Sequence, residues 1–142
     1  MSSELPSLKE DVRSNQVEVI TDRQYKSLEL GVSLLNELRI ADFDETETLS
    51  GLSNNQYSFN MSSWTESNHN GFAIKLSDMS CRTAIDYEII IQENGNNIYK
   101  EHFSKATNIT VKAHNNSKFN VIINNLSTDT LKYKIKINSY IR

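Results

Sequence analysis

The sequence predicts an all-β protein, an antiparallel β-sandwich with one N-terminal helix and a mobile N-terminal arm. From residue 55 onward, apolar and polar residues alternate with a period of two, which is typical of strands that bury one face and expose the other. Two of these segments are joined by Asn94-Gly95, a dipeptide that favours a two-residue hairpin turn. Only residues 21–38 have the three- and four-residue apolar spacing that favours a helix.

Length and composition are typical of one domain. The 142 residues are enough to bury a core, and the single cysteine, Cys81, has no partner for an internal disulfide. We expect residues 1–20 to form a flexible arm or a short strand, and residues 21–142 to form one β-sandwich domain that includes the helix. The net charge of −3 argues against a nucleic-acid partner, and no apolar run is long enough for a transmembrane segment.

The first residues of the sequence bear on the cellular location of the protein. Residues 1–6 lack the basic and apolar regions of a signal peptide. We therefore expect a cytoplasmic protein if this start is native, and an extracellular or cell-surface protein if a leader has been removed. The abundance of Asn, Ile and Lys is explained as well by a low-GC bacterial genome as by turn chemistry.

The N-terminal arm contains one short segment that can form a strand. Val17 and Val19 alternate with Glu18, whereas the residues before them are polar with few apolar side chains. A strand in an arm can pair with its own sheet or with the exposed edge of a neighbour, so Val17 and Val19 are candidate assembly residues. The alternative is a disordered tail.

Residues 21–38 carry the signals of a helix. Thr21 can cap the first turn, and Gln24 lies three residues on, as in a capping box. An apolar stripe follows at helical spacing, and we expect it to cover the end of a sheet. The alternation of Leu28, Leu30 and Val32 leaves a strand as the alternative. The stripe consists of Tyr25, Leu28, Val32, Leu35 and Leu38.

Four carboxylates lie within six residues, at Asp42, Asp44, Glu45 and Glu47. Oxygen ligands from one loop suit calcium, so these residues are a candidate metal site. The segment lacks the central glycine and the distal glutamate of an EF-hand, and the alternative is a solvated acidic loop. No other cofactor is indicated.

The remaining segments predict six or seven strands at short, even spacing, which favours an antiparallel sandwich. Apolar and polar residues alternate most clearly in the last strand. Its solvent-exposed face carries Lys132, Lys134 and Lys136, which can bind an anionic surface or take part in assembly. The apolar faces are Tyr57, Phe59 and Met61; Phe72, Ile74 and Leu76; Ile85, Tyr87, Ile89 and Ile91; Ile98, Tyr99 and Phe103; Ile109, Val111 and Ala113; Phe119, Val121 and Ile123; and Leu131, Tyr133, Ile135 and Ile137.

One polar loop, residues 62–70, holds the only tryptophan of the chain. Trp64 stands among small polar residues with His69 and Asn70, a composition that suits stacking against a sugar or an apolar patch of a partner. These three residues are the candidate ligand site. The alternative is that Trp64 plugs one end of the sandwich.

Catalytic motifs are missing from the sequence. His69, His102 and His114 have no metal-ligand spacing, and Ser53 lacks the second glycine of a nucleophile elbow. Cys81 is a lone thiol beside a predicted strand, where packing is the usual role. We therefore predict that the protein is not an enzyme.

The order of the segments carries a family resemblance over residues 42–140. It rests on Asp42-Phe43-Asp44 before residues 56–59, on residues 71–76, on residues 86–91 leading into Asn94-Gly95, and on residues 118–123 before residues 133–137. This order resembles the jelly-roll sandwiches of the pre-peptidase C-terminal and collagen-binding type that are appended to secreted bacterial peptidases. The resemblance implies a jelly-roll fold and a non-catalytic adhesive or accessory role.

The sequence thus favours a non-enzymatic binding or assembly module that acts through strand edges, loops and the N-terminal arm. Its expected partner is a protein, a second copy of itself or a carbohydrate. One alternative is a self-assembling structural subunit in which residues 1–20 complete the sheet of a neighbour. Another is a small hydrolase or a toxin-like, membrane-active sandwich.

Overall fold

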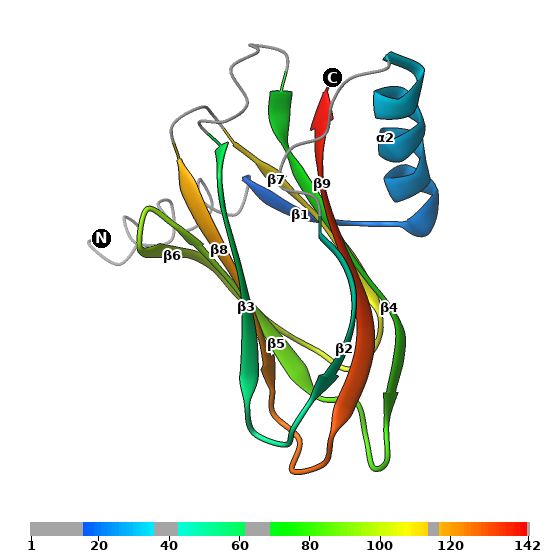
Figure 1. Cartoon of the computed structure of the whole chain (residues 1–142), viewed down its shortest axis with the longest axis vertical. Helices are drawn as coiled ribbons and strands as arrows, with labels where there is room; N and C mark the ends of the chain where they lie inside the picture. Colours follow the sequence, from blue (N-terminus) through cyan, green and yellow to red (C-terminus); the bar gives the residue numbers. More distant parts are fainter. Residues whose placement is uncertain (1–15, 36–42, 62–68, 114–116, 142) are drawn as a thin grey trace, which may run out of the picture.

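The computed structural model describes residues 16–35, 43–61, 69–113 and 117–141. Within these residues, two antiparallel sheets face each other, and one helix lies on the outer side of one sheet (Figure 1). The predicted all-β sandwich with an N-terminal helix is confirmed. No helix in the described ranges is long and apolar enough to cross a membrane.

The first sheet has five strands and the second has four. In the five-stranded sheet the order is β1 (Val17–Ile20), β7 (Thr107–Lys112), β4 (His69–Cys81), β9 (Leu131–Ile141) and β2 (Phe43–Leu49). In the four-stranded sheet the order is β3 (Asn54–Asn60), β8 (Lys118–Asn125), β5 (Tyr87–Glu93) and β6 (Asn96–Phe103).

The strand pairs are nested along the chain. Strand β5 pairs with β6, β4 with β7, β3 with β8 and β2 with β9, all antiparallel. A long hairpin that is rolled up so that these pairs fall into two sheets is a jelly roll, so the expected jelly-roll order is present in the chain's own topology. Strand β1 extends the five-stranded sheet by pairing with β7 of the same chain.

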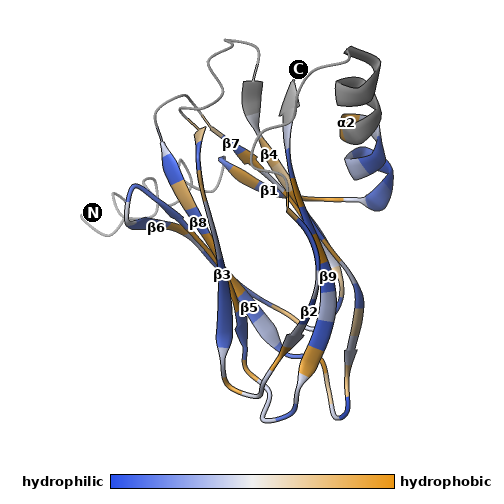
Figure 2. Ribbon diagram, in the orientation of Figure 1, coloured by the Kyte–Doolittle hydropathy of each residue, from blue (hydrophilic) through white to orange (hydrophobic). Residues whose placement is uncertain are grey.

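The core lies between the two sheets because alternate side chains of each strand point inward. In β9, Leu131, Tyr133, Ile135 and Ile137 are at most 1% exposed, and the lysines between them face outward. Figure 2 shows the same alternation as successive hydrophobic and hydrophilic bands along the strands. A slip of one residue would bury the lysines, so this pattern fixes the register.

The predicted turn at Asn94-Gly95 is confirmed. Asn94 has φ 51° and Gly95 has φ 85°, the pair of positive values that a type I′ hairpin turn requires. Asn94 also fastens the turn to the neighbouring strand β8. Its backbone N–H donates to the Lys118 carbonyl (2.8 Å), and its Oδ1 accepts from the Lys118 backbone N–H (2.9 Å).

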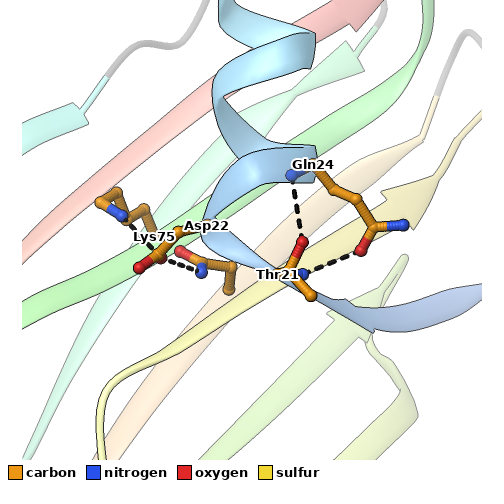
Figure 3. A network of polar contacts seen from close by, with 5 residues as sticks. Thr21, Asp22, Gln24 and Lys75 are labelled. Atoms are coloured by element: carbon orange, nitrogen blue, oxygen red, sulfur yellow. Dashed lines mark hydrogen bonds and ion pairs between the residues drawn. The ribbon is translucent and has the colours of Figure 1, made fainter.

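The single described helix, α2 (Asp22–Leu35), begins with the expected capping box. Thr21 Oγ1 accepts from the Gln24 backbone N–H (3.1 Å), and Gln24 Oε1 accepts from the Thr21 backbone N–H (2.9 Å; Figure 3). The strand alternative for residues 28–32 is therefore wrong. Residues 36–38 lie outside the described residues.

Helix α2 covers the outer face of the five-stranded sheet instead of the end of a sheet. Tyr25 is buried there against Ala73, with Ile20 and Leu28 at the margin of this small second core. Its hydroxyl accepts a hydrogen bond from Asn138 Nδ2 (2.9 Å). Next to it, Asp22 accepts from Lys75 Nζ (3.1 Å) and from Asn108 Nδ2 (2.6 Å; Figure 3).

The acidic segment is a strand, and the expectation of a solvated loop was wrong for residues 43–49. In β2, Asp44, Thr46 and Thr48 lie directly opposite Lys136, Lys134 and Lys132 of β9. Opposite charges and threonines in cross-strand positions stabilise the pair, although Asp and Glu have low intrinsic strand propensity. The tertiary partner therefore overrides the local preference.

Candidate functional site on the four-stranded sheet

The outer face of the four-stranded sheet carries mostly uncharged polar side chains. In β3, β5 and β8 their neighbours along the strand are mostly buried, so these residues point away from the core, and the register places the β6 residues beside them. The register places them in rows that cross all four strands. We call this surface the amide face; it consists of Asn54, Gln56, Ser58, Asn60, Glu88, Ile90, Gln92, Asn97, Lys100, His102, Lys118, Asn120, Ile122 and Asn124.

A chain of hydrogen bonds runs across the amide face with Asn120 at its centre. Asn120 Oδ1 accepts from Ser58 Oγ (2.9 Å), and its Nδ2 donates to Gln56 Oε1 (2.9 Å) and to Gln92 Oε1 (3.2 Å). Gln92 Nε2 in turn donates to Asn97 Oδ1 (2.9 Å). One connected set of amides therefore joins β3, β8, β5 and β6 and holds their side chains in fixed orientations.

Two directly opposed isoleucines lie beside this chain. Ile90 of β5 faces Ile122 of β8 in the register, and both are half-buried on the outer side. Gln56 is the cross-strand neighbour of Ile122 on one side, and Lys100 is the neighbour of Ile90 on the other. The amide face therefore has a small apolar centre with hydrogen-bonding groups around it.

Charged groups gather at the end of the amide face farther from the hairpin turn. Glu88 accepts from Asn124 Nδ2 (3.2 Å), and its other carboxylate oxygen lies 4.0 Å from Lys100 Nζ. His102 Nε2 contacts the Asp86 carboxylate. Lys100 and His102 at this end therefore lie against acidic partners.

A shallow hollow of about 380 Å³ lies at the other end, beside the hairpin turn. Amides and a hydroxyl supply its polar atoms, and Lys118 is the charged residue among those that line it. Both hydrogen-bond donors and acceptors are thus available along its wall. The lining residues are Ser58, Phe59, Asn60, Gln92, Gly95, Lys118, Phe119 and Asn120.

Inside the sandwich, a second polar network lies beneath this sheet and joins it to the other one. Tyr57 donates to Glu47 Oε2 (2.8 Å), and the Tyr57 and Tyr133 hydroxyls are 2.8 Å apart. Asn55 Nδ2 donates to the Tyr133 hydroxyl (3.2 Å). Burial, followed by the hydrogen bond with Tyr133, raises the pKa of Tyr57 far above its ordinary value, and burial also raises the pKa of Tyr133. Both phenols therefore stay protonated.

The structure does not gather the candidate calcium ligands. Asp42 lies outside the described residues, Asp44 faces outward opposite Lys136, and Glu45 and Glu47 fall on the inner side of β2. Glu47 already accepts a hydrogen bond from Tyr57. Among the residues that the structure describes, no group of three or more His, Cys, Asp or Glu could hold a metal ion.

The other candidate sites are only partly placed. Trp64 lies outside the described residues, and His69 and Asn70 belong to β4 without described side chains, so that ligand site stays a prediction. Val17 is buried in the core, whereas Val19 is 53% exposed. The lysines at 132, 134 and 136 line the outer face of the five-stranded sheet, on a strand that has neighbours on both sides. Their role in assembly stays a prediction too.

Sequence analysis missed the amide face. Most of its residues occupy the polar positions of segments that are recognised as strands by their apolar positions. A signal was present, because the outward positions of β3 and β8 are nearly all Asn, Gln or Ser, whereas those of β9 are mainly Lys.

The fold defines this chain as a small jelly-roll β-sandwich. No family model and no curated protein matches it. Among solved structures it is similar to a mitogen from Yersinia pseudotuberculosis, with 18% identity, a TM-score of 0.46, and coverage of 71% of this chain and 86% of that one.

Two carbohydrate-binding modules have a similar degree of likeness. One is CBM51 from Clostridium perfringens GH95 in complex with methyl-galactose, with 5% identity, a TM-score of 0.43, and coverage of 72% and 92%. The other is CBM36 in complex with calcium and xylotriose, with 9% identity, a TM-score of 0.41, and coverage of 70% and 99%. The resemblance to the pre-peptidase C-terminal type stays a prediction.

Proposed function

We propose that this chain is a non-enzymatic carbohydrate-binding module whose ligand lies along the amide face. The observation that carries the proposal is the hydrogen-bonded chain centred on Asn120, which crosses all four strands and ends beside a hollow. Amide side chains both donate and accept hydrogen bonds, which is what the hydroxyl groups of a sugar also do. The two surfaces are therefore chemically complementary.

The geometry of the site also favours binding. Asn120 is half-buried and holds the amides of Gln56 and Gln92 in place, so little side-chain entropy is lost when a ligand arrives. The site lies on strands, which position side chains more precisely than loops do. The Ile90–Ile122 pair offers an apolar surface to the C–H groups of a sugar ring.

Binding of oligosaccharides to the full chain, measured by calorimetry after a screen on a glycan array, tests the proposal. Asn120→Ala should weaken binding about tenfold or more, because it removes the centre of the chain and the three hydrogen bonds that orient Ser58, Gln56 and Gln92. Thr46→Ala on the outer face of the other sheet is the matched control and should bind normally. Equal affinity of both variants and the wild type would refute the site.

A second candidate function is self-assembly through the N-terminal strand. Val17 is buried in the core, and β1 is an edge strand of only four residues, so the same four residues could pair with β7 of another copy. Light scattering behind a sizing column tests this. Large regular particles from the full chain, and a monomer from a chain without residues 1–20, are expected if assembly is the function.

A further inference from the structure

The charges around the hollow are unbalanced. Lys118 is exposed at its rim, and within the described part of the chain its ammonium group has no hydrogen-bond or ion-pair partner. The other basic residues of the amide face, Lys100 and His102, lie against Glu88 and Asp86. The hollow therefore presents one unpaired positive charge next to neutral amides.

The nearest acidic residue along the turn faces away from this charge. Glu93 is paired with Phe119 in the register, which places its side chain on the inner side of the sheet. There its carboxylate accepts from Gln16 Nε2 (3.0 Å) and from Ser117 Oγ (2.7 Å). These neutral donors satisfy Glu93, so it does not neutralise Lys118.

The backbone around Lys118 is fixed and its surroundings are open. Asn94 makes two hydrogen bonds to the main chain of Lys118, which join the hairpin turn to the start of β8. Apart from Gly95 and its two chain neighbours, no heavy atom of the described residues lies within 4 Å of the position that a Cβ on Gly95 would occupy. A ligand group can therefore approach the Lys118 ammonium between the turn and the strand.

We infer that the amide face binds an acidic saccharide, with its carboxylate or sulfate in the hollow against Lys118. The hydroxyls of the same ligand lie along the Asn120 chain. This inference rests on the proposed function and adds a substrate class to it. A charge-assisted hydrogen bond is about twice as strong as a neutral one, so the acidic form should bind roughly tenfold more tightly than a neutral form.

The test compares each acidic oligosaccharide with its own methyl ester, which keeps the sugar and removes the charge. Tetramers of galacturonate, mannuronate and hyaluronan, each in both forms, are titrated into the full chain by calorimetry. The wild type should bind at least one of the acids about tenfold more tightly than its methyl ester. This ratio should fall as the salt concentration rises from about 0.05 to 0.5 M, because the Debye length shortens roughly threefold. Lys118→Gln should bind acid and ester alike.

Two variants sharpen the comparison. Lys118→Glu should reverse the preference, so that the ester binds better than the acid. Lys134→Gln removes one positive charge from the outer face of the other sheet and should behave as the wild type does. Because Lys118 contacts its neighbours through backbone atoms, both changes at this position should leave the melting temperature unchanged.

The outcomes separate the two proposals. If the esters bind as well as the acids, or if Lys118→Gln keeps the preference, the inference about charge is wrong and the carbohydrate site stands. If no acid and no ester binds, the inference about an acidic saccharide is wrong, and the glycan array with the Asn120→Ala variant decides the carbohydrate site by itself.

Discussion

The hydroxyl of Tyr57, on the four-stranded sheet, lies 2.8 Å from the hydroxyl of Tyr133, on the five-stranded sheet. This hydrogen bond joins the two layers inside the core, and Glu47 and Asn55 extend it in both directions. A buried polar chain of this kind specifies one arrangement of the sheets, because any other would leave its members unpaired.

Replacing Tyr57 by phenylalanine should therefore destabilise the fold. The change removes the hydrogen bonds of the Tyr57 hydroxyl to Glu47 and to Tyr133 while the ring still fills its space, and Tyr133 keeps only its bond from Asn55, so we expect the free energy of unfolding to fall by about 1–3 kcal/mol. Urea denaturation followed by circular dichroism measures this. Tyr99→Phe is the control, because no hydrogen bond of the Tyr99 hydroxyl is present in the described structure; an equal loss in both variants would contradict the role of the network.

Stability should also fall in strong alkali. Burial raises the pKa of Tyr99 to about 12, and it raises the pKa values of Tyr57, Tyr87 and Tyr133 as well. Because the folded values lie above the ordinary value near 10, the stabilisation is complete below about pH 10 and is lost as pH rises through the folded values. Absorbance at 295 nm, recorded with circular dichroism, should show these phenols ionising together with unfolding. Ionisation of all six tyrosines near pH 10 with the fold intact would refute this.

Acid should weaken the attachment of helix α2. Hydrogen bonds from Asn108 and then Lys75 lower the pKa of Asp22 from 3.8, so their contribution is present above that value and is lost as pH falls through the lowered one. Asp22→Asn should therefore melt at a lower temperature than the wild type at pH 7, and this difference should shrink as pH falls below 3.8. Glu18→Gln, at an exposed carboxylate of β1, serves as the control. A difference that persists in acid would show that charge at position 22 is not the cause.

Asn125 should be sensitive to substitution. It is 1% exposed, and its Nδ2 donates to the carbonyls of Leu49 (3.2 Å), Ser50 (3.1 Å) and Asp129 (2.9 Å). It thereby fastens the turn after β2 to the loop after β8. Asn125→Ala should lower the free energy of unfolding by about 1–3 kcal/mol, because buried carbonyls lose their donor. Denaturation of the Asn124→Ala variant, at a half-buried amide on the outer face of the same strand, provides the comparison; equal effects would contradict the role of Asn125.

Calcium should leave the melting temperature unchanged. Asp44 and Glu47 point to opposite sides of β2, and Glu47 is already bound by Tyr57. A ligand that binds the native state raises its melting temperature according to its affinity. Scanning fluorimetry with and without millimolar calcium measures this, and a rise that Asp44→Asn abolishes would restore the calcium site.

The local features of the fold could be predicted from the sequence. The Asn94-Gly95 turn and the Thr21–Gln24 box are each encoded within a few residues, and both have the expected geometry. Strand β2 could not be recognised, because its stabilising partner, the lysine row of β9, lies 84 to 92 residues further along the chain. Local propensity contains no information about such a partner.

The candidate site also depends on pairings between segments that are far apart in the sequence. Asn120 meets Ser58 across 62 residues and Gln92 across 28 residues, and only the register of three strands brings these amides together. Alternation shows that each of them is exposed, but it does not show that they are neighbours. A polar face therefore becomes visible only when the sheet order is known.

The nested strand pairing has a consequence for the order in which the chain folds. The β5–β6 hairpin closes across two residues, whereas β2 must wait for β9, which ends at Ile141. Distant contacts form slowly because the loop between them must first close. During synthesis on the ribosome, the backbone groups of β2 therefore remain without their ladder until β9 has been synthesised, and a chaperone or a neighbouring nascent chain would meet this edge first.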